Sequence, residues 1–334
     1  MTEAAELADA LVQRGLLQSA DAPTRSGDDT RPWFISAVLG VAGWLAGLLT
    51  LLFVWQLFEP SSASGFALAG AVMLAAALGL YYADRDSAFF AQLALALWIA
   101  GQLGIVWWAE ETTRSPASTA AIMTVLELAL LCVTRNRMAR TLASFFACIG
   151  WALAVRFAWW DSSPFDLYKQ PIALSPALAG WVVIWAPVAA LAEILIRTEP
   201  VWLAAGARSI ARPALGGLLA ALAVGTWTSE PFAALSILFV GAGATNWLAL
   251  WPLLGAASAL FAAGCAFRLR ERAFLGLAVV GALLHVTQFY YVLGTTLVVK
   301  SAIMLAAGCV ALGLAWFLRG HVLARDARDA GGAP

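Results

Sequence analysis

The sequence predicts an all-α, polytopic transmembrane helix bundle of about ten spanning helices, with both termini in the cytosol. Hydrophobic residues make up 62% of the chain and charged residues only 12%, and the mean hydropathy is +0.82. In a soluble domain, charged residues approach about a quarter. Apolar runs of about bilayer thickness follow one another along the chain. Positive charge gathers in every second gap between these runs, as the positive-inside rule expects for cytosolic loops.

The apolar runs indicate helices rather than the strands of a membrane β-barrel. Barrel strands would be segments of about ten residues with alternating polarity. The runs here are about 20 residues long and apolar on every face, and a helix satisfies its backbone amides within its own segment. We expect ten spanning segments, at residues 33–57, 65–83, 88–109, 117–134, 141–160, 176–196, 213–228, 248–267, 273–293 and 295–318.

The basic residues predict the orientation of these segments. With the N-terminus in the cytosol, the outside gaps hold only Arg114 and Lys169. The inside gaps hold Arg14, Arg25, Arg31, Arg85, Arg135, Arg137, Arg140, Arg197, Arg208, Arg212, Arg268, Arg270, Arg272, Arg319, Arg325 and Arg328. One more apolar run, 231–244, is short for a full span, and if it crossed, the arginines after it would face outward. We therefore expect 231–244 to be either re-entrant or outside-lying.

The domain organisation follows from the same pattern. Residues 1–31 are predicted to form a short cytosolic amphipathic helix, at 2–14, and a polar tether rich in turn-forming residues. Residues 32–319 form the transmembrane helical domain, and residues 320–334 a cytosolic tail. The N-terminus is acidic and too long before the first apolar run for a cleavable signal peptide, so we expect the first spanning helix itself to direct insertion.

Composition argues against several classes of function. The net charge is zero, so no global field attracts nucleic acid. The two histidines form no H-E-x-x-H motif, and the cysteines form no C-x-x-C pair. The four cysteines are interpreted as small packing residues: Cys132, Cys148, Cys265 and Cys309. We expect no metal and no cofactor. Catalytic Ser-His-Asp order, paired carboxylates and a nucleotide-binding loop are also missing from the sequence, which favours a non-enzymatic protein.

Some residues inside the runs are predicted to pack between helices. Trp44, Trp98 and Trp151 lie away from the run ends, where interfacial tryptophans gather. Gly43 and Gly47 lie four residues apart, a spacing that permits close backbone approach. Near a cytosolic end, Glu193 precedes Arg197 by four residues, which predicts a stabilising pair on one helix face.

Ionisable groups inside the runs are the candidate functional residues, because a charge costs roughly 2.5–3.5 kcal/mol at the bilayer centre. Glu127 lies midway along its run, as either a proton or cation site or a packed carboxyl group. A second candidate is a polar layer in the outer half of the membrane, made of Arg156, His285, Thr287, Gln288, Tyr290, Tyr291, Lys300 and Ser301. This layer either receives an anionic headgroup, a carboxylate or a partner's acidic residue, or consists of snorkelling cations and belt tyrosines.

Two stretches resemble a known family: PWFISAVLGVAGWLAGLLTLLFVWQLF at 32–58 and HVTQFYYVLGTTLVVKSAIMLAAGCVALGLAWFLR at 285–319. They are similar to the bacterial multi-pass membrane family of domain of unknown function 4401, related to the predicted membrane proteins of domain 2157. The matching positions include Phe289, Tyr290, Tyr291, Leu293, Thr295, Thr296, Leu297, Lys300 and Ser301. The resemblance implies a bacterial inner-membrane protein, with a GDYXXLXY-domain protein as its partner, and it implies no catalytic residues.

Three functions remain open from the sequence. The favoured one is a non-enzymatic membrane scaffold or complex subunit that docks a partner through the polar layer. The alternative is a transporter or lipid-handling protein that uses the same layer together with Glu127, and an intramembrane enzyme is the third. A cavity joining Glu127 to the layer would favour transport, whereas a packed interior with a polar outer surface would favour the scaffold.

The topology is testable with reporter fusions. A fusion placed after Ala327 should report a cytosolic location, because basic residues concentrate in the gaps that share this side. A periplasmic signal from this fusion would overturn the ten-helix model.

Overall fold

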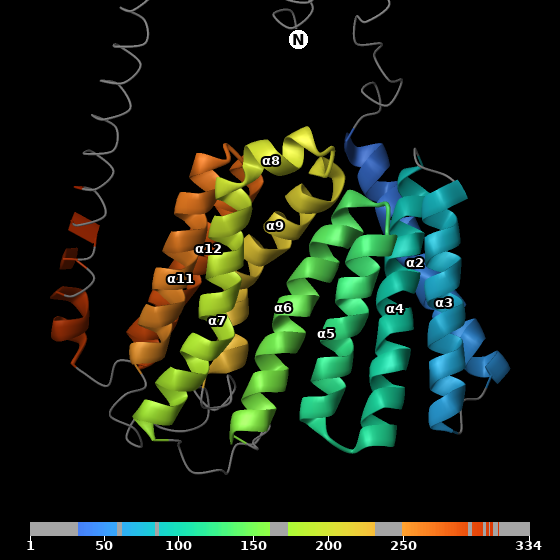
Figure 1. Cartoon of the computed structure of the whole chain (residues 1–334), viewed down its shortest axis with the longest axis horizontal. Helices are drawn as coiled ribbons and strands as arrows, with labels where there is room; N and C mark the ends of the chain where they lie inside the picture. Colours follow the sequence, from blue (N-terminus) through green and yellow to red (C-terminus); the bar gives the residue numbers. More distant parts are fainter. Residues whose placement is uncertain are drawn as a thin grey trace, which may run out of the picture. The chain divides into compact units, whose positions relative to one another are not determined.

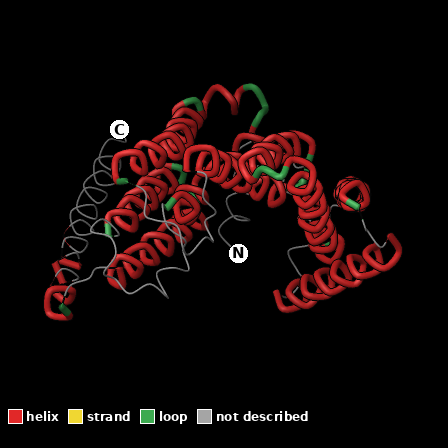
Figure 2. The backbone as a smooth tube through the Cα atoms, turned by 90° about the horizontal axis from the view of Figure 1, so that it is seen from below, coloured by secondary structure: helices red, strands yellow, loops and turns green. Residues whose placement is uncertain are grey.

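The computed structural model describes residues 33–58, 62–83, 87–160, 173–230, 249–292, 296–302, 305–306, 308–309 and 313. This part of the chain consists of helices joined by short loops (Figure 1, Figure 2). Eight of the described helices are long and apolar enough to cross a membrane. The predicted fold class, a polytopic helical membrane protein, is therefore confirmed.

Nine of the ten predicted segments correspond to observed helices, with boundaries that differ by a few residues. Helices of 17 to 26 residues are about 26–39 Å long at 1.5 Å per residue, close to the roughly 30 Å hydrocarbon core. They are α2 (Trp33–Phe58), α3 (Ala63–Ala83), α4 (Ala88–Thr113), α5 (Pro116–Val133), α6 (Arg137–Trp160), α7 (Leu174–Arg197), α9 (Arg208–Val224), α11 (Leu250–Arg268) and α12 (Arg272–Val292). A short helix that the sequence analysis did not predict, α8 (Glu199–Ala204), joins α7 to α9.

Several predictions fall on residues that the structure does not describe. The tenth segment is helical at 297–302, where the Lys300 amide donates to the Thr296 carbonyl over 3.0 Å, but most of 303–318 lies outside the described residues. The helix at 2–14, the tether, the run 231–244 and the tail at 320–334 also lie outside them. The count of ten and the cytosolic location of both termini therefore stay predictions.

The chain divides into two compact units. The first holds α2, α3, nearly all of α4 and residues 134–136, and small residues bring its helices together. A Cβ atom on Gly47 would lie 2.5 Å from Cβ of Ala96, and one on Gly70 would lie 2.6 Å from the Gly101 carbonyl oxygen. The close approach expected at Gly47 is thus observed. Trp98 is fully buried within this unit, as predicted.

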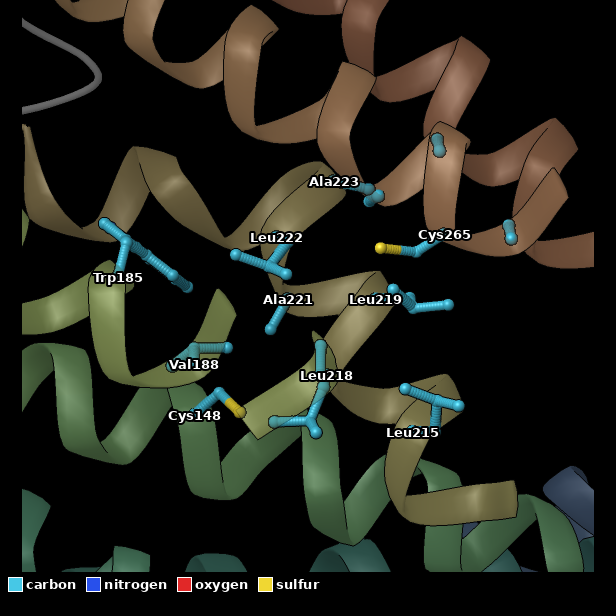
Figure 3. Close-up of a cluster of buried hydrophobic side chains, with 14 of the residues drawn as sticks. Cys148, Trp185, Val188, Leu215, Leu218, Leu219, Ala221, Leu222, Ala223 and Cys265 are labelled. Atoms are coloured by element: carbon cyan, nitrogen blue, oxygen red, sulfur yellow. The ribbon is translucent and has the colours of Figure 1, made fainter. Parts of the chain in front are cut away.

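The second unit holds the remaining described helices, and α9 is at its centre. α9 contacts α6, α7, α11 and α12. Eleven of its 17 residues are buried, against four of the 21 residues of α12. Its leucines and alanines pack with Trp185 and Val188 from α7 and with two cysteines, Cys148 of α6 and Cys265 of α11 (Figure 3). These two cysteines are packing residues, as the sequence predicts.

Arginines from different gaps meet carboxylates at one end of the second unit, which we call the arginine-rich end. The predicted Glu193–Arg197 pair is confirmed, with 2.7 Å between Oε1 and Nε, and Arg268 reaches the same carboxylate at 3.0 Å. Arg212 binds both Glu199 and Glu271 at 2.7 Å. Helices α6, α9 and α12 begin at this end, and α7 and α11 finish there.

The contact between α6 and α9 depends on Gly217, and a methyl group there should be destabilising. An added Cβ would lie 2.5 Å from the Thr141 carbonyl oxygen and 2.6 Å from the Phe145 amide nitrogen. Gly217→Ala should therefore cost about 1–3 kcal/mol, the usual range for overpacking. Thermal unfolding in detergent measures the loss.

Gly264→Ala is the matched control, because no atom of the described neighbouring residues lies within 4 Å of a Cβ at this position. Alanine favours helix formation over glycine by about 1 kcal/mol, so this variant should be neutral or slightly stabilised. Equal thermal midpoints for the two variants would contradict the close-packed α6–α9 contact.

Candidate functional site

The end of the second unit opposite the arginine-rich end holds a buried polar network, which begins where α9 stops. After Val224 the chain continues as a 3₁₀ turn, η3 (Gly225–Ser229), and Glu230 follows. The end of a helix leaves backbone carbonyls without helical partners. Two are satisfied by side chains of the turn itself: the Thr228 hydroxyl donates to the Gly225 carbonyl over 2.7 Å, and the Ser229 hydroxyl to the Thr226 carbonyl over 2.8 Å.

A buried arginine holds this turn against α6. Arg156 and Glu230 are only 1% and 2% exposed. The Arg156 guanidinium donates through Nη1 to the Thr228 carbonyl oxygen over 2.9 Å and to the Glu230 carbonyl oxygen. Both carbonyls belong to the segment that directly follows α9, so this contact fixes the end of α9 against α6.

Gln288 attaches the same carboxylate to α12. Its Nε2 donates to Oε1 and Oε2 of Glu230 over 3.0 and 2.9 Å. Its Oε1 accepts a hydrogen bond from Trp227 Nε1 over 2.7 Å. One amide therefore binds both a residue of the turn and the acid that follows it, and all three groups are at least partly buried.

His285 lies one turn earlier on α12 and is fully buried. Its Nε2 is 3.0 Å from the Thr226 hydroxyl oxygen, and its ring meets Trp227 edge to face at 5.2 Å between centroids. Gly255 of α11 makes room for the imidazole, because any Cβ there would overlap it. We call the residues that share these contacts the terminal network: Arg156, Thr226, Trp227, Glu230, His285 and Gln288.

Glu127 lies apart from the terminal network. A Cβ on Gly150 of α6 would touch Thr124 of α5, so these two positions face each other. Since the helices run in opposite directions, Glu127 lies one turn to one side of this contact and Arg156 nearly two turns to the other. That places them about 13 Å apart along the helix axes. Glu127 is fully buried, and neither of its carboxylate oxygens has a hydrogen-bond partner among the described residues.

The model of the family described as Domain of unknown function (DUF4401) matches residues 32–320. The chain belongs to this family. No curated protein and no solved structure matches it significantly. Both stretches that carry the resemblance lie within the match, and so do the terminal network and Glu127.

The structure of this DUF4401 protein divides the predicted polar layer into two groups. Arg156, His285 and Gln288 belong to the terminal network. Lys300 instead lies over the Tyr290 ring, with Nζ 5.1 Å from the centroid, and that ring packs edge to face on Tyr291 at 5.7 Å. The remaining hydroxyls bond to carbonyls of their own helices, Thr287 to Leu283 and Ser301 to Leu297, on exposed faces.

Sequence reasoning missed the acid at the centre of the terminal network. Neither Glu230, which follows the expected segment 213–228, nor Trp227, which lies near the end of that segment, was singled out in the sequence analysis. Thr226, Ser229 and Trp185, whose Nε1 donates to the Ser229 hydroxyl over 2.6 Å, were not singled out either. The available signal was the sequence GTWTSEP at 225–231, where three hydroxyls and an acid end an apolar run just before a proline.

Among the described residues, no group of three His, Cys, Asp or Glu side chains is placed to hold a metal ion. The terminal network instead joins α6, the end of α9 and α12 through hydrogen bonds, from Arg156 to backbone carbonyls and between side chains of the turn and of α12. These hydrogen bonds brace three helices at one end of the second unit.

Replacing Gln288 tests this bracing. Gln288→Leu removes both hydrogen bonds to Glu230 and leaves Trp227 Nε1 without its acceptor. Stranding buried polar groups costs about 1–3 kcal/mol, so the thermal midpoint in detergent should fall. The neighbouring Thr287→Val is the control, because its hydroxyl is exposed and bonds only within α12. If both variants unfold at the same temperature, the network does not brace the helices.

Proposed function

We propose that this DUF4401 protein is a non-enzymatic scaffold or complex subunit of the bacterial inner membrane, which docks a partner protein beside the outer end of α12. The docking region is a contiguous group of side chains that we call the tyrosine surface, made of Thr287, Tyr290, Tyr291, Lys300 and Ser301. The observation that carries this proposal is that the predicted polar layer divides into two separate groups: the buried terminal network and this exposed surface.

The terminal network supports a bracing role. Arg156 is committed to backbone carbonyls, Glu230 to Gln288, and His285 to Thr226. A group that must bind and release a substrate has to exchange partners, and each exchange here would strand a buried charge or amide. These contacts are better suited to holding three helices in a fixed arrangement than to handling a ligand.

The tyrosine surface supports docking because its polar groups face outward. Tyr291 is 69% exposed, and Thr287 and Ser301 are exposed as well. The Lys300 ammonium has a ring as its neighbour but no ion pair among the described residues. Tyrosine is enriched at protein interfaces because it combines apolar area with a hydrogen-bonding tip.

The chemistry of this surface favours a partner membrane protein that offers a carboxylate at the same depth. Lys300 is the one basic residue of the surface, and a partner's acid would pair with it while apolar side chains cover the tyrosines. The GDYXXLXY-domain protein implied by the family resemblance is the partner to test first.

The experiment is co-purification in mild detergent of the chain with a co-expressed GDYXXLXY-domain protein. Lys300→Met should reduce the partner retained about tenfold, which corresponds to about 1.4 kcal/mol of binding free energy. Lys300→Arg is the matched control and should retain it, because arginine keeps both the charge and the contact with the Tyr290 ring.

The thermal midpoints of both variants, measured alone, separate lost docking from lost folding. Equal retention of the partner by wild type and Lys300→Met would contradict docking through this surface. If the wild-type chain instead co-purifies with a lipid, and Lys300→Met loses that lipid, the proposal would be replaced by lipid handling.

A further inference from the structure

Glu127 has no role in the bracing or the docking described above, and its surroundings are unusual for a carboxyl group. It is fully buried, and both oxygens have no hydrogen-bond partner among the described residues. It lies eleven residues after the first residue of α5, which is about 16 Å along the helix axis. This places it well inside a membrane-spanning helix rather than at an interface where a side chain can snorkel.

The charged groups on the helices that pack against α5 within the second unit are all engaged elsewhere or lie far away. On α6, Arg137 pairs with Glu271, Arg140 donates to the Ser209 carbonyl, and Arg156 belongs to the terminal network. On α9, Arg212 pairs with Glu199 and Glu271, and Arg208 is exposed at the first position of the helix. The remaining titratable group on α6 is the Cys148 thiol, which lies in the hydrophobic core.

The nearest hydroxyl on α5 does not compensate Glu127 either. Thr124, one turn earlier, donates its hydroxyl to the Ala120 carbonyl over 2.9 Å. A carboxylate in these surroundings would be a buried charge without a hydrogen-bond donor or a counter-ion, which proteins avoid by neutralising the group.

A bound proton and a bound metal cation are the two ways to neutralise it. A cation needs several oxygen ligands, six or more for Ca²⁺ and about six for Mg²⁺. No group of three His, Cys, Asp or Glu side chains is placed to hold one among the described residues. A proton needs only the carboxylate itself.

We infer that Glu127 is a proton-binding site of the second unit and is a neutral carboxylic acid at neutral pH. The proton can leave only when water or a basic group reaches the buried carboxyl, which requires the packing around α5 to open. Proton occupancy is therefore coupled to the packing of this helix. This inference does not rest on the docking proposal, since it uses none of the tyrosine surface.

Infrared spectroscopy of the purified full-length protein tests the site. A protonated carboxyl group gives a C=O stretching band that is separate from the bands of carboxylates and shifts in D₂O. The difference between wild type and Glu127→Gln at neutral pH should contain this band as a loss in the variant, whatever other buried acids contribute. Glu193→Gln is the control, because Glu193 is ion-paired with Arg197 and Arg268, and it should leave the acid band unchanged.

A second measurement covers the case in which Glu127→Gln fails to fold. Dicyclohexylcarbodiimide is apolar and adds to protonated carboxyl groups in membranes, so the wild-type peptide containing Glu127 should carry the adduct, whereas the peptide containing Glu193 should not. An acid band present in wild type and lost in Glu127→Gln, or the adduct at Glu127, supports the site. A wild-type spectrum without the acid band at neutral pH overturns it.

Discussion

Inside a bilayer, a backbone that leaves the α-helical conformation must find its hydrogen bonds within the protein, because no water is available to supply them. The second unit meets this constraint at the end of α9. There the chain tightens into the 3₁₀ turn at 225–229, and carbonyl groups freed by the turn are bonded by Thr228, Ser229 and Arg156. The position of Glu230, and through it the position of α12, depends on how this turn is satisfied.

The turn also explains why charged side chains are tolerated so close to the hydrocarbon core. A guanidinium has five donors in a planar fork, which lets Arg156 bind two backbone carbonyls of the turn. A lysine or a neutral amide at the same position would satisfy fewer of these groups. Gln288 then donates to both carboxyl oxygens of Glu230, so this acid is buried with its side-chain oxygens hydrogen-bonded.

The sequence predicted the helices well because hydropathy is a local property, and lipid imposes the same length on every span. It also singled out Arg156, His285 and Gln288, since polar side chains within apolar runs are rare enough to be noticed one by one. It did not find Glu230, whose contacts with Arg156 and Gln288 span 74 and 58 residues of sequence. No periodicity records such a pairing. The sequence also could not separate Lys300 from the terminal network. That separation depends on contacts between residues that are far apart in the sequence.

Glu127 and Glu230, both buried in the described part of the second unit, show that depth alone does not decide what a carboxyl group does. Glu230 accepts hydrogen bonds from Gln288 at its carboxyl group and from Arg156 at its backbone carbonyl, so this acid contributes to holding helices together. Glu127 lies in the interior of α5, and neither of its carboxyl oxygens has a hydrogen-bond partner among the described residues. The Thr124 hydroxyl, one turn earlier on the same helix, is already bonded to the Ala120 carbonyl. If bracing were the only demand on α5, an apolar residue of similar volume would pack there at lower cost. A carboxyl group at this position is therefore better explained by the proton it can bind than by the packing it provides.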